Sequence, residues 1–157
     1  MKLAIIAAHD PGLLIGKEGA LPWHYREDME WFKRVTTGHT VIMGRGVFEE
    51  LGEKPLPGRR NVVLSRTRNY SGVVVCRTIS DALESVRNED LAFVIGGAEI
   101  YSALLNRVDE LYITEIHKEY SGDTWFPEYR DRIGSEFKEV YREHGEQITF
   151  VKYRRTG

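Results

Sequence analysis

Short, uninterrupted apolar runs are the feature that most constrains how this 157-residue chain can fold. Residues 3–8 and 91–95 contain no charged side chain, which is typical of strands that are covered on both faces. Residues 40–43, 61–65 and 73–76 are further short runs that predict strands. Helical patterns separate these runs, and strands that alternate with helices indicate an α/β fold on a mainly parallel, twisted sheet.

Several stretches between these runs predict helices. Pro22 opens a segment without further Gly or Pro that reaches Gly38, which predicts a helix of about three turns. Ser80 is a good N-cap for a helix over 81–88. The remaining elements expected here are helices over 47–51 and 98–105 and a strand over 110–117.

Two segments near the end of the chain, 137–141 and 148–153, alternate apolar and polar residues. This alternation predicts a closing antiparallel strand pair with one solvated face. No repeat, low-complexity segment or linker divides the chain. We therefore expect one domain over residues 1–157, in which helices flank the sheet.

Charge and composition argue against several classes of function. The net charge is −2 and no basic stripe is present, so we expect no binding to nucleic acid. No apolar stretch approaches the roughly 18 residues that a membrane helix needs, and the run after Lys2 is too short for a signal peptide. The single cysteine, Cys76, suits a reducing cytoplasm, and with five scattered histidines it predicts no metal site.

Asp28 is the unusual residue of the first predicted helix. On a helical wheel Tyr25, Trp31, Phe32 and Val35 all fall within about 60° of it. A carboxylate inside an apolar stripe is costly unless something pairs with it. The residues alone leave two interpretations: an acid that satisfies N–H groups of the first helical turn, or a carboxylate that holds a protonated or N–H-rich ligand in a pocket.

Three of the expected strands end in glycine or arginine, at Met43-Gly44-Arg45-Gly46, Leu64-Ser65-Arg66-Thr67 and Ile95-Gly96-Gly97-Ala98. Ligands of an open parallel sheet bind beyond the carboxyl ends of its strands, where glycine allows close approach and free N–H groups suit phosphate. Any one of these ends could be a simple turn with a solvated arginine, but three equivalent ends favour a phosphate-rich ligand. The G-x-G-x-x-G fingerprint is absent. Arginines stand where an acid would hold a ribose hydroxyl, which favours a 2′-phosphate if the ligand is a nicotinamide dinucleotide.

A series of motifs extends from about residue 3 to the final strands. It comprises Ile15-Gly16, Leu21-Pro22-Trp23, Asp28 with Trp31-Phe32-Lys33, Val41-Ile42-Met43-Gly44-Arg45, Pro55-Leu56-Pro57-Gly58-Arg59, Val94-Ile95-Gly96-Gly97, Ile100-Tyr101 and Gly122-Asp123-Thr124-Trp125-Phe126-Pro127. In order and spacing these motifs resemble dihydrofolate reductase of the bacterial type. None is decisive alone, but together they are highly specific.

The resemblance implies reduction of 7,8-dihydrofolate to tetrahydrofolate with NADPH, by hydride addition at C6 and protonation at N5, in the service of one-carbon metabolism. Asp28 would face the 2-amino group and N3–H of the pterin and raise its proton affinity, while water delivers the proton and Trp23 helps to hold that water. Arg59 would clamp the α-carboxylate of the glutamate tail, because a guanidinium fork suits a carboxylate. The implied substrate-binding residues are Ile6, Ala7, Asp28, Met29, Phe32, Leu51, Leu56, Arg59 and Thr114.

The resemblance also implies a set of cofactor contacts. The nicotinamide would lie near Ala8, Ile15, Ala20 and Ile95, the phosphates near Gly46, Val47, Gly97 and Ala98, the 2′-phosphate near Arg45, Ser65 and Arg66, and the adenosine side near Arg77. Gly16, Gly96, Ile100 and Tyr101 complete the set. Residues 15–21 would form a lid over the nicotinamide, with Gly122-Asp123 as its docking partner.

Two departures from the family pattern concern binding. Val47-Phe48 stands where many members have Thr-Trp, so one hydroxyl donor to a cofactor phosphate is lost. Glu53-Lys54 lengthens the loop before Pro55. Neither change touches the reacting groups.

Two other functions remain open at this stage. A related NADPH-dependent reductase that acts on a pyrimidine intermediate of riboflavin synthesis shares the fold, and a non-catalytic nucleotide-binding module would bind NADPH without turnover. Asp28 after Pro22-Trp23 and Arg59 after the Pro-Gly turn favour folate, because a pterin and a glutamate tail require them. We expect a monomer.

Overall fold

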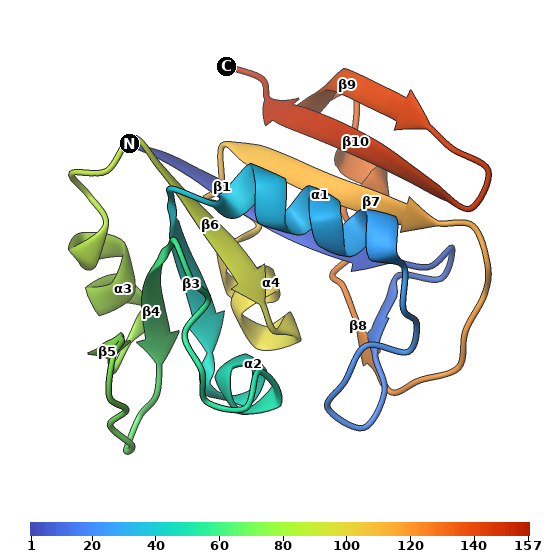
Figure 1. Ribbon diagram of the computed structural model, residues 1–157. Helices are drawn as coiled ribbons and strands as arrows, with labels where there is room; N and C mark the ends of the chain where they lie inside the picture. Colours follow the sequence, from blue (N-terminus) through green and yellow to red (C-terminus); the bar gives the residue numbers. More distant parts are fainter.

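An eight-stranded sheet forms the frame of the protein in the computed structural model, which describes residues 1–157 (Figure 1). The order of strands across it is β5-β4-β3-β6-β1-β7-β10-β9. The strands are β1 (Lys2–His9), β3 (Thr40–Gly44), β4 (Arg60–Leu64), β5 (Val74–Cys76), β6 (Leu91–Gly96), β7 (Glu110–Ile116), β9 (Phe137–His144) and β10 (Ile148–Arg155).

Most neighbouring strands of the sheet run parallel. β1 pairs in parallel with both β6 and β7, and β3 pairs in parallel with β4 and β6. β10 is antiparallel to β7 and to β9. The predicted α/β class, with a mainly parallel sheet and a closing antiparallel pair, is therefore confirmed. One consequence matters for function: the carboxyl ends of the parallel strands lie along one edge of the sheet.

Helices cover both faces of the sheet. α1 (Arg26–Thr36) and α2 (Arg45–Glu50) pack on one face, in a buried cluster that includes Trp31 and Phe48. α3 (Ile79–Ser85) and α4 (Ala98–Leu104) pack on the other face, in a larger cluster that includes Ala82 and Leu104. The central strands are therefore buried from both sides, which is why their sequences are continuously apolar. No helix is both long and apolar enough to cross a membrane.

Several predicted boundaries were wrong. α1 starts at Arg26 and not directly after Pro22, because the segment before Tyr25 is extended and places Trp23 in the core. α3 begins earlier than predicted, because its N-cap is Thr78, whose hydroxyl accepts from the N–H of Asp81 at 3.0 Å. The predicted single solvated face is wrong for the closing pair, because β10 is buried over most of its length up to Tyr153, whereas β9 is largely exposed.

The stretch after β1 is not a continuous loop. It contains a short strand, β2 (Leu14–Gly16), which pairs with β8 (Thr124–Trp125) from the far end of the chain. The sequence before Gly16 carries no strong strand signal, and its partner lies more than one hundred residues away. A pattern confined to one window cannot reveal such a pairing.

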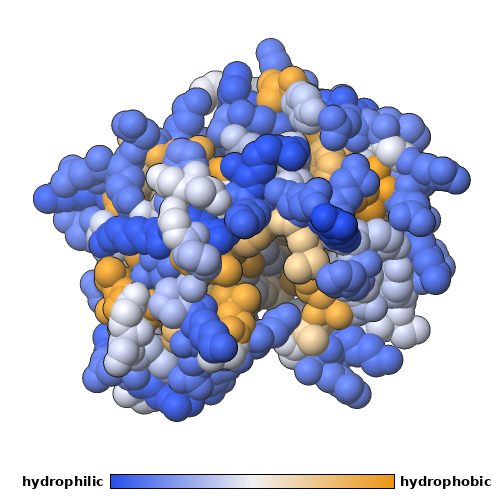
Figure 2. Space-filling view, viewed as in Figure 1, coloured by the Kyte–Doolittle hydropathy of each residue, from blue (hydrophilic) through white to orange (hydrophobic).

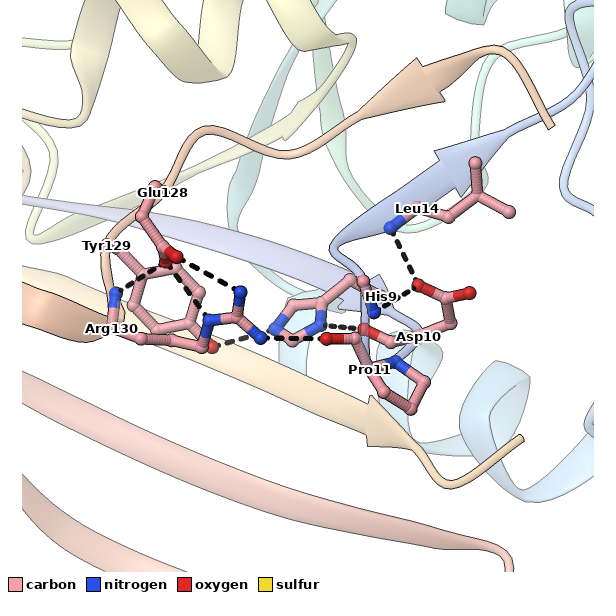
Figure 3. A network of polar contacts seen from close by, with 8 residues as sticks. His9, Asp10, Pro11, Leu14, Glu128, Tyr129 and Arg130 are labelled. Atoms are coloured by element: carbon pink, nitrogen blue, oxygen red, sulfur yellow. Dashed lines mark hydrogen bonds and ion pairs between the residues drawn. The ribbon is translucent and has the colours of Figure 1, made fainter. Parts of the chain in front are cut away.

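A polar network fixes the end of β1 (Figure 3). His9 is buried, and burial lowers the pKa of its ring, so the imidazole is neutral at pH 7. Its Nδ1 lies 2.7 Å from the carbonyl oxygen of Asp10, and a carbonyl only accepts, so Nδ1 carries the proton. Nε2 therefore accepts from the hydroxyl of the buried Tyr129, also at 2.7 Å.

Asp10, the next residue, holds two segments together. Its Oδ1 accepts from the N–H groups of Gly12 and Leu14, both at 2.8 Å, and its Oδ2 accepts from the N–H of Tyr120 at 3.0 Å. Arg130 closes the network from outside, by donating to the carbonyl of Pro11 and pairing with Glu128. The start of β2 and the loop before β8 are thereby tied to the same carboxylate.

The His9–Tyr129 hydrogen bond leads to a prediction about stability. Tyr129→Phe leaves the buried Nε2 of His9 without a partner, which should lower the free energy of unfolding by about 1–3 kcal/mol. Urea denaturation would measure the change. The matched control is Tyr141→Phe, whose hydroxyl makes only an exposed contact with Glu143 and whose loss should cost less than about 0.5 kcal/mol. Equal effects of the two substitutions would contradict this role of Tyr129.

Candidate functional site

The candidate site lies where the carboxyl ends of the parallel strands meet. Pairing aligns Gly44 of β3 with Leu64 of β4, and Met43 with Gly96 of β6, so the three strand ends predicted to bind phosphate are neighbours. On the face that carries α1, Figure 2 shows a hollow lined by apolar side chains. A crevice at this edge is the usual ligand site of an open α/β sheet.

Asp28 is held by a side chain of the sheet. Thr114 Oγ1 on β7 donates to Asp28 Oδ1 at 2.7 Å. Asp28 lies in the first turn of α1, as the interpretation of a helix-start acid requires, but its oxygens accept from Thr114 and from no N–H group of that turn. Burial raises the pKa of the Asp28 carboxyl, and the hydrogen bond from Thr114 opposes that rise. The group is thus half-buried and has one anchored oxygen.

Most of the predicted apolar walls of the substrate pocket belong to one layer. Ile6 is part of the buried cluster beneath α1, and Phe32, Leu51 and Leu56 pack against that cluster. Two predicted wall residues differ. Ala7 belongs to the cluster on the opposite face of the sheet, because successive residues of a strand point to opposite sides. Met29 is 54% exposed.

Hydrogen bonds within the protein fix the orientation of the Arg59 guanidinium. Its Nε donates to the carbonyl of Pro57 at 3.0 Å, and its Nη1 donates to Thr36 Oγ1 at 3.1 Å. Its guanidinium also lies 5.9 Å from the centre of the Phe32 ring. Burial lowers the pKa of Arg59 slightly below its usual range, but an arginine remains charged at neutral pH. Nη2 has no partner in the protein and is available to an anion beside Phe32.

The glycine-rich ends of β3 and β6 pack closely together. A Cβ added to Gly44 would lie 3.1 Å from Ile100 Cδ1, and Gly96 has a φ of +128°, which favours glycine. Val47 approaches this point, since its Cγ2 would lie 3.4 Å from a Cβ on Gly96. Tyr101, on α4, is held in place by a hydrogen bond from its hydroxyl to the carbonyl of Ile6 at 2.9 Å. Gly46, Ile95, Gly97, Ala98 and the partly buried Ala8 lie along the same edge.

The predicted lid and its docking partner are in contact. The N–H of Asp123 donates to the carbonyl of Gly16, and the N–H of Glu18 donates to Asp123 Oδ2, both at 3.0 Å. The hydrogen bond from Glu18 is the main cause of the lowered pKa of Asp123. Gly122 must be glycine, because a Cβ there would collide with the carbonyl of Gly16. Within the lid, Ile15 packs against the larger buried cluster and Ala20 is exposed.

Trp23 has neighbours that the sequence analysis missed. Its ring centre lies 5.3 Å from that of Tyr120, whose hydroxyl lies 2.7 Å from the hydroxyl of Tyr25. The Nε1 of Trp23 is buried and has no hydrogen-bond partner in the protein. A buried N–H donor without a partner suits an ordered water or a ligand atom. Only tertiary structure brings residue 120 here, and no local signal in the sequence indicates it.

The residues predicted to bind the 2′-phosphate lie together, and Arg77, predicted near the adenosine, has a structural role beside them. Ser65 is 5% exposed, and Arg45 and Arg66 are exposed. Arg77 is exposed and folds back on the loop after β4, since its Nη1 donates to the carbonyls of Ser65 and Arg68. Arg77 therefore shapes the segment after β4, and its guanidinium is mostly occupied. Arg68 joins this cluster, and no motif in the sequence indicates it.

The residues present fit a nicotinamide dinucleotide phosphate. A Cβ added to Gly46 would meet no protein atom within 4 Å, so the start of α2 is open to a ligand, and exposed arginines stand where a 2′-phosphate requires positive charge. By contrast, no group of three His, Cys, Asp or Glu side chains is arranged to hold a metal ion.

Comparisons with known proteins agree with this geometry. The family model for dihydrofolate reductase matches residues 2–155. The chain is 41% identical over 145 residues to dihydrofolate reductase of Bacillus subtilis, covering 91% of this chain and 84% of that protein. It is 44% identical over 131 residues to dihydrofolate reductase type 3 of Salmonella typhimurium, covering 82% of this chain and 80% of that protein.

A solved structure is similar over almost the whole chain. Dihydrofolate reductase from Enterococcus faecalis, in complex with NADP(H) and RAB-propyl, superposes with a TM-score of 0.91 at 33% identity, covering 99% of this chain and 97% of that one. These matches decide among the three functions left open by the sequence. The chain belongs to the dihydrofolate reductase family, which reduces dihydrofolate with NADPH.

Proposed function

We propose that this protein reduces 7,8-dihydrofolate to 5,6,7,8-tetrahydrofolate by hydride transfer to C6 and protonation at N5, and so supplies one-carbon metabolism. The observation that carries the proposal is the Asp28 carboxylate, anchored by Thr114 at the edge where the glycine-rich strand ends meet. NADPH, when bound, supplies the hydride. The protein's own residues orient the pterin, stabilise its protonated form and keep bulk water away.

Asp28 binds the pterin through its remaining acceptor capacity. Thr114 occupies one lone pair of Oδ1, which leaves Oδ2 and part of Oδ1 for the 2-amino group and N3–H. These charge-assisted bonds favour the carboxylate and offset its burial. The negative charge raises the proton affinity of the bound pterin, and water then delivers the proton to N5. Trp23 would hold this water, because its buried Nε1 lacks a protein acceptor.

The other assignments divide between the two ligands. The pterin and the benzoyl ring would contact Ile6, Phe32, Leu51 and Leu56, together with Met29 at the pocket entrance and the backbone of Ala7. Arg59 would bind the α-carboxylate of the glutamate tail. Ala8, Ile15, Gly16, Ala20 and Ile95 would contact the nicotinamide. The cofactor phosphates would contact Gly46, Val47, Gly96, Gly97 and Ala98, which Ile100 and Tyr101 support. The 2′-phosphate would contact Arg45, Ser65 and Arg66, and Arg77 would lie near the adenosine.

We further propose that residues 1–157 act as one domain and as a monomer in the cytoplasm. The two buried clusters share one continuous sheet, which supports a single domain. The single cysteine, Cys76, is buried and unpaired, as suits a reducing compartment.

One assay tests the proposed function as a whole. NADPH absorbance at 340 nm is followed with and without dihydrofolate. We expect oxidation of NADPH that depends on dihydrofolate. Binding of NADPH without such turnover would overturn the proposal in favour of a non-catalytic module.

Asp28→Asn tests the role of the carboxylate. The variant keeps the shape of the side chain but removes the charge, so hydride transfer to dihydrofolate at pH 7 should slow by about 100-fold or more. NADPH binding should persist. The measurement is the hydride-transfer rate as a function of pH in both proteins.

The direction of the pH dependence follows from the required proton. In the unsubstituted protein the rate should decline as pH rises through the apparent pKa of the complex, because protonated pterin becomes scarce. In Asp28→Asn, lower pH should speed the reaction, since solvent must supply what the carboxylate did. A variant with near-normal rates at pH 7 would show that Asp28 takes no part in the chemistry.

Arg59→Ala tests the glutamate clamp. Loss of a charge-assisted contact of roughly 1.5–3 kcal/mol should weaken dihydrofolate binding at least about tenfold and leave NADPH binding nearly unchanged. A dihydropterin without the glutamate tail serves as the control substrate and should show no loss. Equal weakening of both substrates would mean that Arg59 only supports the fold through Thr36 and Pro57.

A further inference from the structure

Glu49 and Arg68 form an ion cluster with Arg45 that neither the sequence motifs nor the assignments above explain. Glu49 lies on α2, one helical turn after Arg45, and Arg68 lies in the segment that follows β4. A single oxygen, Glu49 Oε2, is 3.5 Å from Arg45 Nε and 3.3 Å from Arg68 Nη1. Two guanidinium groups from different elements therefore converge on one anionic oxygen.

The spacing of these arginines fits one phosphate group. Since both nitrogens contact the same oxygen, they lie within about 7 Å of each other. Two nitrogens that each donate at about 2.8 Å to different oxygens of one phosphate span a similar distance. The carboxylate of Glu49 thus occupies a position from which a phosphate could bind both arginines.

The backbone of Arg68 is fixed by residues already assigned to this part of the site. Its N–H donates to Ser65 Oγ at 3.0 Å, and its carbonyl accepts from Arg77 Nη1 at 2.7 Å. Its guanidinium lies 5.4 Å from the centre of the Tyr70 ring, which directs it along the surface toward Glu49. The Oγ–H of Ser65 has no acceptor within the protein and remains available beside these arginines.

We propose that Arg68 is a further 2′-phosphate ligand and that Glu49 is an internal anion that competes with this phosphate for Arg45 and Arg68. When the phosphate binds, it replaces Glu49 as the acceptor of both guanidinium groups. Glu49 thereby lowers the preference for NADPH over NADH, and Arg68 raises it. The inference rests on the proposed function, since it assumes that the cofactor's 2′-phosphate binds at Arg45 and Ser65.

A purely structural role for the cluster makes a different prediction. Ion pairs between exposed side chains contribute little to stability, and all three residues are at least one-third exposed. If the cluster only tied α2 to the segment after β4, substitutions would affect both cofactors equally. Discrimination between cofactors that differ only at the 2′ position separates the two roles.

The experiment compares Arg68→Gln and Glu49→Gln with the unsubstituted protein. Dissociation constants are measured by fluorescence for NADPH and NADH, and for the fragments 2′,5′-ADP and 5′-AMP, at low ionic strength. The control is Arg60→Gln, because Arg60 also forms an exposed ion pair, with Glu89, but lies at the opposite end of β4. Thermal unfolding verifies that each variant is folded.

We expect Arg68→Gln to weaken NADPH and 2′,5′-ADP about tenfold and to leave NADH and 5′-AMP unchanged. Glu49→Gln should strengthen binding of NADPH and 2′,5′-ADP, again without effect on NADH. Both differences should shrink at high salt, which screens exposed charges. Arg60→Gln should change none of these constants.

Two results would overturn the inference. Equal effects of Arg68→Gln on NADPH and NADH, or no effect on either, would show that Arg68 does not bind the 2′-phosphate. Weaker NADPH binding by Glu49→Gln would show that Glu49 holds the arginines in place and does not compete. Failure of the unsubstituted protein to bind NADPH or to reduce dihydrofolate would instead contradict the proposed function, so the two failures are distinguishable.

Discussion

Burial of β1 on both faces explains where the protein can place its polar groups. β1 lies between β6 and β7 near the centre of the sheet, and Ala4 and Ile5 have no exposed surface. A strand in this position cannot carry a charged group along its length, so polar chemistry begins only where the strand ends, at His9 and Asp10. In β6, and in β3 after Thr40, glycine likewise appears only at the carboxyl end. The binding edge follows from the burial of the strands.

Two sites of opposite charge lie along this edge, one that binds N–H donors and one that binds an anion. Asp28 is a half-buried carboxylate whose pKa is raised by burial, and its Thr114 partner satisfies only part of its hydrogen-bonding capacity. It suits a ligand rich in N–H donors. At the far side of the edge, Arg45 and Arg68 are exposed cations that share the carboxylate of Glu49, and they suit an exchangeable phosphate. Binding at Asp28 therefore depends on a partly desolvated carboxylate. Binding at Arg45 and Arg68 depends on exposed charge and should weaken as salt concentration rises.

The loops at this edge are tied to one another through long-range contacts. Asp10 binds both Leu14 and Tyr120, and Gly16 and Glu18 bind Asp123. Tyr120 in turn packs on Trp23. Movement of the lid would therefore have to break hydrogen bonds to the loop before β8, and displacement of that loop would disturb the packing around Trp23. These contacts give residues 16–18 a defined position against the loop before β8.

The α/β class, most strands and the place of Asp28 in the apolar stripe of α1 could all be predicted from sequence, because strand burial and helical periodicity produce patterns within short segments of the chain. The family motifs also sufficed to predict contact between the lid and Gly122-Asp123. The folded structure alone reveals the β2–β8 pairing, the Tyr120–Trp23 contact, the hydrogen bonds of Arg77 to the loop after β4 and the sharing of Glu49 by Arg45 and Arg68. Each of these contacts joins side chains from separate segments of the chain. The folded sheet brings those segments together, and no pattern within a single short segment predicts the contact.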